Sequence, residues 1–109
     1  IYKGYSEKYI NRYRAVLPLF IKTQKFMPAE RFIVLAKACL TCNTYDKLDN
    51  IKCPVLVLGG GKDKVVTVEA SLEIAEKLNC EYYIYEDLGH EAYNEAKDFN
   101  KRIYEFFAD

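Results

Sequence analysis

One short segment constrains the fold more than any other part of this sequence. Residues 55–58 are Val, Leu, Val and Leu, and three consecutive glycines follow them at residues 59–61. A continuous apolar run that is rich in β-branched residues and closed by glycine is typical of a strand buried on both faces, as in a parallel sheet. Because parallel strands need a crossover connection, the next residues should form a helix that leads into a second strand.

The residues after the glycines have this pattern. Thr67 can cap a helix, and the apolar residues expected on its inner face are Leu72, Ile74, Ala75 and Leu78. Residues 82–85 form the second expected strand, and a closing helix follows. The inner face expected for that closing helix consists of Phe99, Ile103, Phe106 and Phe107. The order strand, helix, strand, helix predicts an α/β fold with two parallel strands and a right-handed crossover.

Residues 1–45 have a different pattern, which is helical throughout. Ser6 can cap a first helix, and Pro18 should end or kink it. The apolar positions of that helix are Tyr9, Ile10, Tyr13 and Leu17. Pro28 suits the first turn of a second helix, whose apolar face is expected to consist of Phe32, Leu35, Ala36 and Cys39. We therefore predict a helical segment over residues 1–45 and a β-α-β-α part over residues 46–109.

The charge balance excludes some classes of partner. The 109 residues carry 16 basic and 16 acidic side chains, so there is no electrostatic support for binding nucleic acid. No apolar run is long enough to span a bilayer, and we expect no membrane partner. Residues 1–50 hold nine basic and four acidic residues, whereas residues 51–109 hold seven and twelve. This split favours two parts that meet each other or a missing partner, and chance surface composition is the other interpretation.

Nothing in the sequence predicts a metal or a cofactor. The four cysteines lie where small apolar residues would pack, at Cys39, Cys42, Cys53 and Cys80. Free thiols favour a reducing compartment, so we expect a cytoplasmic protein. Cys39 and Cys42 have the C-x-x-C spacing, but they fall at the C-terminal end of a helix, where redox or zinc chemistry is disfavoured. Lys64 stands where a dinucleotide-binding fingerprint needs Gly, and Asp63 stands where a P-loop needs Ser or Thr.

Two titratable residues follow the two expected strands. Asp63 and His90, the single histidine, each lie five residues past the end of a strand. Ligands of open parallel sheets bind at the carboxyl ends of the strands, where these two loops should open side by side. A carboxylate beside an imidazole can fix its tautomer and stabilise the imidazolium. Glu86 and Asp87 are closer to His90 in sequence and are alternative partners, although neighbours in one loop rarely face each other's side chains.

From Asp46 onward, the sequence resembles the C-terminal part of an α/β-hydrolase. The resemblance rests on residues 54–60, on Asp63 with the two valines after it, on Gly89 and His90, and on the aromatic closing helix. It implies that Asp63 is the acid of a catalytic triad and His90 its general base. Residues 1–45 then resemble the end of the helical cap of such enzymes.

The tyrosines of the first helix have two interpretations. They recur every three to four residues, at Tyr2, Tyr5, Tyr9 and Tyr13. They can form an aromatic face packed on the core. Alternatively, they can line an acyl or aromatic pocket beneath a cap.

The family's nucleophile is missing from this sequence. Its serine lies on a G-x-S-x-G turn, whereas Ser6 lacks the second glycine and Ser71 falls inside a helix. Because Ile1 rather than Met opens the sequence and two strands make a poor sheet, we expect a C-terminal fragment of a serine-dependent hydrolase. We expect it to be inactive alone, with a small-molecule ester as the substrate of the parent enzyme and self-association through the open sheet edge. The alternative is a non-catalytic binding or assembly module.

Overall fold

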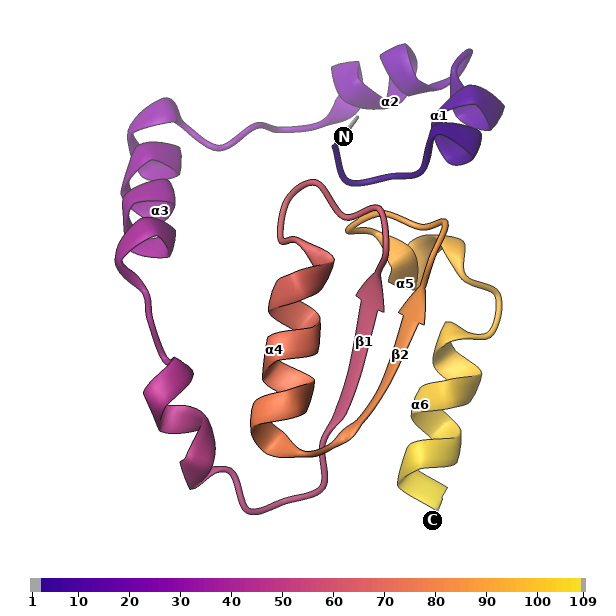
Figure 1. Ribbon diagram of the computed structural model, residues 1–109. Helices are drawn as coiled ribbons and strands as arrows, with labels where there is room; N and C mark the ends of the chain where they lie inside the picture. The colour runs from indigo at the N-terminus through magenta and orange to yellow at the C-terminus, as the bar shows by residue number, and fades with distance from the viewer. Residues whose placement is uncertain (1–2, 109) are drawn as a thin grey trace.

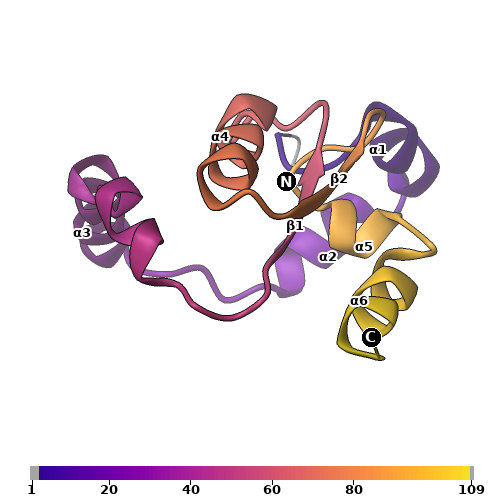
Figure 2. The same cartoon turned by 60° about the horizontal axis from the view of Figure 1, so that its bottom comes forward.

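The computed structural model describes residues 3–108 and has a two-stranded parallel sheet at its centre (Figure 1). The elements are, in chain order, α1 (Glu7–Tyr13), α2 (Leu17–Thr23), α3 (Ala29–Thr41), the 3-10 helix η1 (Tyr45–Asn50), β1 (Leu56–Gly60), α4 (Val68–Leu78), β2 (Glu81–Tyr85), α5 (Ala92–Glu95) and α6 (Phe99–Ala108). Helices α1 and α2 lie beyond the carboxyl ends of the strands, whereas α3 stands apart from the sheet (Figures 1 and 2).

The pairing of the two strands confirms the predicted parallel sheet. Leu56 lies opposite Glu81, and Gly60 lies opposite Tyr85. Helix α4 makes the crossover and packs on the face of the sheet that carries Ile84. Helix α6 covers the other face, where the Arg102 guanidinium lies 3.4 Å from the centre of the Tyr83 ring. The fold class is therefore α/β, with two parallel strands and flanking helices, as predicted.

Glycine is required where β1 meets the loop after β2. A Cβ atom on Gly60 would lie 2.2 Å from the carbonyl oxygen of Gly89, so a side chain at Gly60 would force the two segments apart. The same loop is crossed on its other side by the N-terminal segment, since a Cβ on Gly89 would lie 2.6 Å from the carbonyl oxygen of Gly4. The glycine run thus sets the close approach of the two loops at the carboxyl ends of the strands.

The first predicted helix is two helices in the structure. Ser6 caps α1 as predicted, and its Oγ accepts a hydrogen bond from the N–H of Tyr9 at 3.2 Å. However, α1 ends at Tyr13, and Leu17 begins α2, so the prediction that Pro18 ends a helix is wrong. Pro18 lies in the first turn of α2, where a residue without an N–H loses no helical hydrogen bond. Pro28 immediately precedes α3, which ends at Thr41.

Several side chains that were predicted to be inside are exposed. The apolar face of α3 is uncovered, with Phe32 at 65% exposure, and Phe107 of α6 is 79% exposed. Leu72 and Ile74 of α4 are also exposed, and only Ala75 on that helix is buried. The cysteines depart from the prediction in the same way, because Cys39, Cys42 and Cys53 are exposed and Cys80 is half-buried. The physical reason is that two strands and short helices cover too little of one another within residues 3–108.

Candidate active site

The structure places Asp63 and His90 against each other. Asp63 follows β1 and His90 follows β2, and the two loops meet at the carboxyl edge of the sheet. The Oδ2 atom of Asp63 lies 2.8 Å from Nδ1 of His90. Because β1 and β2 are neighbouring parallel strands, the loops that follow them lie at the same edge of the sheet. Two residues 27 positions apart in the sequence therefore come within hydrogen-bonding distance.

The carboxylate of Asp63 is held in place by its own loop. Its Oδ1 atom accepts hydrogen bonds from the N–H groups of Val65, at 2.7 Å, and Val66, at 2.9 Å. Burial disfavours ionisation, but the hydrogen bonds from His90 and from these two amides outweigh it and hold the pKa of Asp63 below its ordinary value. Asp63 therefore stays an anion that is directed at the imidazole.

The His90 ring is open to an approaching group. Its side chain is 41% exposed, whereas the side chain of Asp63 is only 10% exposed. An ionised Asp63 can only accept hydrogen bonds, so the neutral ring donates from Nδ1. The lone pair of Nε2 is then free to accept a proton. This arrangement can perform general-base catalysis on a hydroxyl placed next to Nε2.

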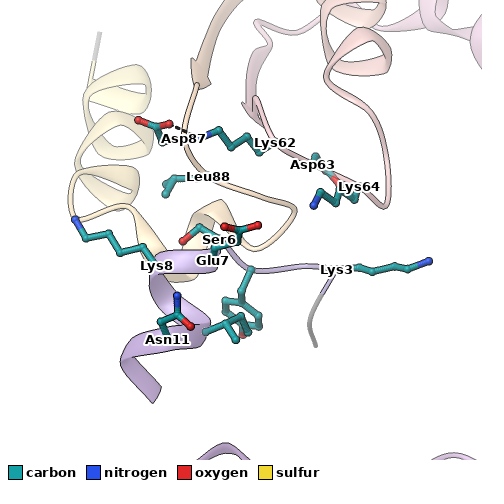
Figure 3. Close-up of a pocket in the computed structure, with 12 residues that line it drawn as sticks. Lys3, Ser6, Glu7, Lys8, Asn11, Lys62, Asp63, Lys64, Asp87 and Leu88 are labelled. Carbon is teal, nitrogen blue, oxygen red and sulfur yellow. Dashed lines mark hydrogen bonds and ion pairs between the residues drawn. The ribbon is translucent and has the colours of Figure 1, made fainter. Parts of the chain in front are cut away.

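The two alternative carboxylates do not partner the His90 ring. Asp87 forms an ion pair with Lys62, with 2.6 Å between Oδ1 and Nζ, and this pair lies at the rim of the pocket in Figure 3. Mutual hydrogen bonding and attraction lower the pKa of Asp87 and raise that of Lys62. Glu86 is exposed. The contact with the histidine therefore comes from the loop of the other strand.

One hollow borders Asp63, and a second hollow shares Tyr5 with it. One, of about 910 Å³, lies between the N-terminal segment and the loops after β1 and β2 (Figure 3), and Asp63 forms part of its wall. Its lysines are Lys3, Lys8, Lys62 and Lys64. The other, of about 480 Å³, lies between α1 and α2 and is almost entirely apolar. Tyr5 lines both hollows.

The tyrosines of α1 form the wall of the apolar hollow. The rings of Tyr5 and Tyr9 stack with their centres 4.6 Å apart, and those of Tyr9 and Tyr13 are 4.5 Å apart. Phe20 of α2 faces the same hollow. Tyr2, the first residue of the predicted series, lies outside the described residues. The tyrosines of α1 thus line a hollow between α1 and α2, and its use as an acyl or aromatic pocket stays a prediction.

Neither serine has the setting of a nucleophile. Ser6 donates hydrogen bonds from its N–H and its Oγ to the carboxylate of Glu95. Ser71 lies on α4 and faces β1, as shown by the 3.0 Å that would separate its Oγ from a Cβ on Gly59. In the part of the chain that the structure describes, no group of three or more potential ligands could hold a metal ion.

The site has one feature that sequence reasoning missed. The segment before α1 lies on the His90 loop, where the carbonyl oxygen of Gly4 accepts a hydrogen bond from the N–H of Glu91 at 2.7 Å. Glu95 holds Ser6 in the same region. These contacts join residues more than 80 positions apart, and no spacing or motif in one sequence signals them.

The comparisons with known proteins identify the family. A family model described as serine aminopeptidase, S33, matches residues 18–97, whereas no curated protein matches the chain. Among the described helices, none is long and apolar enough to cross a membrane. The family match covers most of the chain, including both strands, Asp63 and His90. The chain therefore belongs to the S33 serine aminopeptidase family, within the α/β-hydrolases.

Proposed function

We propose that this chain supplies the acid and the general base of a serine-dependent α/β-hydrolase that cleaves carboxylic esters. The observation that carries the proposal is the 2.8 Å contact between Oδ2 of Asp63 and Nδ1 of His90. In this proposal the chain is the C-terminal part of the enzyme. The nucleophile and the oxyanion hole belong to a part outside residues 1–109, because neither Ser6 nor Ser71 lies on a G-x-S-x-G turn.

The proposed mechanism assigns one role to each residue. Nε2 of His90 takes the proton of the serine hydroxyl as its oxygen attacks the ester carbonyl, and it then gives that proton to the leaving alkoxide. Asp63 keeps the ring in the tautomer that leaves Nε2 free, and it stabilises the imidazolium while the proton is held. Water then releases the acid from the acyl-enzyme through the same base.

The charges around the site favour an ester over a peptide substrate. An aminopeptidase must accept the positively charged α-amino group of its substrate. The hollow beside Asp63 is lined by four lysines and by three carboxylates, those of Glu7, Asp63 and Asp87, so its formal charge is +1. A cation would meet net repulsion there, whereas a neutral or acidic ester would not.

The test uses the enzyme made from its own gene. The open reading frame that contains this sequence is expressed from its start codon and assayed with p-nitrophenyl esters and with an amino-acid p-nitroanilide. His90→Ala should lower kcat for the ester by about 10²- to 10⁴-fold, because it removes the general base. Glu105→Gln, an exposed change on α6, is the matched control and should keep the rate of the wild type. An unchanged rate in His90→Ala would disprove the proposal. Faster cleavage of the anilide than of the esters would show that the substrate is a peptide rather than an ester.

The missing nucleophile favours a second candidate, a non-catalytic binding or assembly module. The sequence of the gene upstream of Ile1 separates the two. An open frame that encodes G-x-S-x-G supports the hydrolase. A start codon next to Ile1 supports the module, and the chain should then show no hydrolysis under any of the assay conditions above.

A further inference from the structure

The segment formed by Gly4, Tyr5 and Ser6, which we call the strap, lies across the loop that carries His90. The carbonyl oxygen of Gly4 accepts a hydrogen bond from the N–H of Glu91, the residue directly after the histidine, at 2.7 Å. On the other side of the histidine, Gly89 approaches the same carbonyl so closely that a Cβ would lie 2.6 Å from it. The strap therefore touches the backbone on both sides of His90.

The carboxylate of Glu95 makes two of the hydrogen bonds that hold the strap in this position. Oε1 of Glu95 accepts a hydrogen bond from the N–H of Ser6 at 2.7 Å, and Oε2 accepts one from the Ser6 hydroxyl. The hydroxyl also accepts the N–H of Tyr9, which links the strap to the first turn of α1. Asn94 adds a hydrogen bond from its Nδ2 to the Tyr5 hydroxyl at 3.2 Å. Glu95 is half-buried, and both of its oxygens are used.

The opposite side of the His90 loop is fixed by the end of β1. Gly60 lies against Gly89, and the N–H of Lys62 donates to the carbonyl of Leu88 at 2.9 Å. The loop is thus held between β1 and the strap. Ser6 and Leu88 both line the hollow that Asp63 also lines (Figure 3). Release of the strap would free one side of the loop while the other stayed in place.

We infer that Glu95 is a positioning residue for His90, because its carboxylate holds the strap on the histidine loop and thereby keeps Nδ1 on Asp63. Hydrogen bonds to an ionised carboxylate are stronger than those between neutral groups. Glutamine at this position offers one acceptor oxygen instead of two, and its amide group faces a donor. The effect of Glu95 on catalysis rests on the proposed role of His90 as general base. Its effect on the contact between His90 and Asp63 does not depend on that role.

The experiment measures the ring of His90 directly. In the enzyme made from its own gene and labelled with ¹⁵N in histidine, the ring signals of His90 are assigned as those that are absent from His90→Ala. In the wild type these should report mainly the Nδ1–H tautomer. Glu95→Gln should shift the signals toward a mixture of tautomers and should speed the hydrogen exchange of the Glu91 amide by about tenfold or more. Glu105→Gln, the same change on an exposed part of α6, should leave both observations unchanged.

The outcomes decide the inference without any assay of activity. Unchanged ring signals in a folded Glu95→Gln variant, whose β1 and β2 amides match the wild type, would overturn it. If that variant does not fold, Ser6→Ala decides, because it removes the hydroxyl donor and keeps the backbone N–H. A tautomer shift in Ser6→Ala then supports the inference, and unchanged signals reject it. Failure of the ester assay would disprove the proposed hydrolase function, but it would not change the ring signals that test the positioning of His90.

Discussion

At the scale of single residues, Asp63 has the hydrogen bonds that its proposed role requires. One oxygen accepts two backbone amides and the other meets Nδ1 of His90. The amides fix the carboxylate, so the imidazole is oriented by a group that cannot itself turn away. Sequence spacing predicted the edge of the sheet at which Asp63 and His90 lie, and it favoured Asp63 over Glu86 and Asp87, which share the histidine's own loop. The contact itself depends on side-chain directions in two separate loops.

Substitution of the two aspartates distinguishes their roles. In the enzyme made from the full gene, Asp63→Asn should lower kcat by about a thousandfold or more, because an amide favours the wrong tautomer of His90. Asp87→Asn should have little effect on the rate, since that carboxylate pairs with exposed Lys62. Initial rates with a p-nitrophenyl ester provide the measurement. Equal losses in both variants would contradict the assignment of Asp63 as the orienting acid.

The lowered pKa of Asp63 makes folding sensitive to acid. Its pKa is lower in the folded chain than in the unfolded chain, so the ionised form stabilises the fold above the unfolded value of about 3.9. This stabilisation is lost as the pH falls through the folded pKa. The difference in Tm between the wild type and Asp63→Asn should therefore be present at about pH 7 and should shrink below about pH 4. A difference that stays constant down to the acid limit would show that the carboxylate does not contribute in this way.

At the scale of elements, local sequence patterns predicted the strands and helix caps that are formed by residues close together in the sequence. The apolar run at β1, the cap position at Thr67 and the cap of α1 at Ser6 all depend on residues within a few positions of one another. The helix that Pro18 was expected to end is instead two helices, because Pro18 suits the first turn of α2. Neither η1 nor the strap was predicted. The strap depends on contacts between the two ends of the chain, which no local pattern contains.

The glycines of β1 differ in how closely other atoms approach them. Gly60→Ala should destabilise the fold by about 1–3 kcal/mol, because its Cβ would lie 2.2 Å from the backbone oxygen of Gly89. Gly59→Ala is the matched neighbour and should cost less. The nearest atoms there are the side-chain ends of Ile84 and Ser71, each 3.0 Å away, and these can turn. Urea unfolding of the two variants gives the comparison, and a larger loss in Gly59→Ala would contradict it.

At the scale of the whole molecule, exposed apolar surface is the main difference between the sequence patterns and the structure. The pattern of α3 predicts a buried face, yet Leu35 is 52% exposed and Phe32 is 65% exposed. Periodicity shows which side of a helix is apolar, but not whether anything in the same chain covers it. The same holds for β1, which has β2 as its only strand neighbour within residues 3–108. The apolar face of α3 and the open edge of β1 are therefore surfaces for association with another chain, and they do not determine the internal fold.

The uncovered edge of β1 predicts that this chain associates with itself. The N–H of Gly61 donates to the carbonyl of Tyr85 at 2.9 Å, and the alternation of a parallel strand then directs the N–H of Leu58 toward the other, open edge. An open edge of this kind pairs with other strands. We expect light scattering to give a dimer or a larger species whose mass rises with concentration.

Two substitutions at one position test whether the edge is responsible for this association. Leu58→Pro removes the edge N–H without removing a donor to β2, so it should shift the chain toward the monomer. Leu58→Ala keeps that N–H and removes a similar part of the side chain, so it controls for lost packing and should keep more of the associated form. A wild-type chain that stays monomeric at high concentration would contradict self-association. Equal association in the proline and alanine variants would instead assign it to the exposed apolar face of α3.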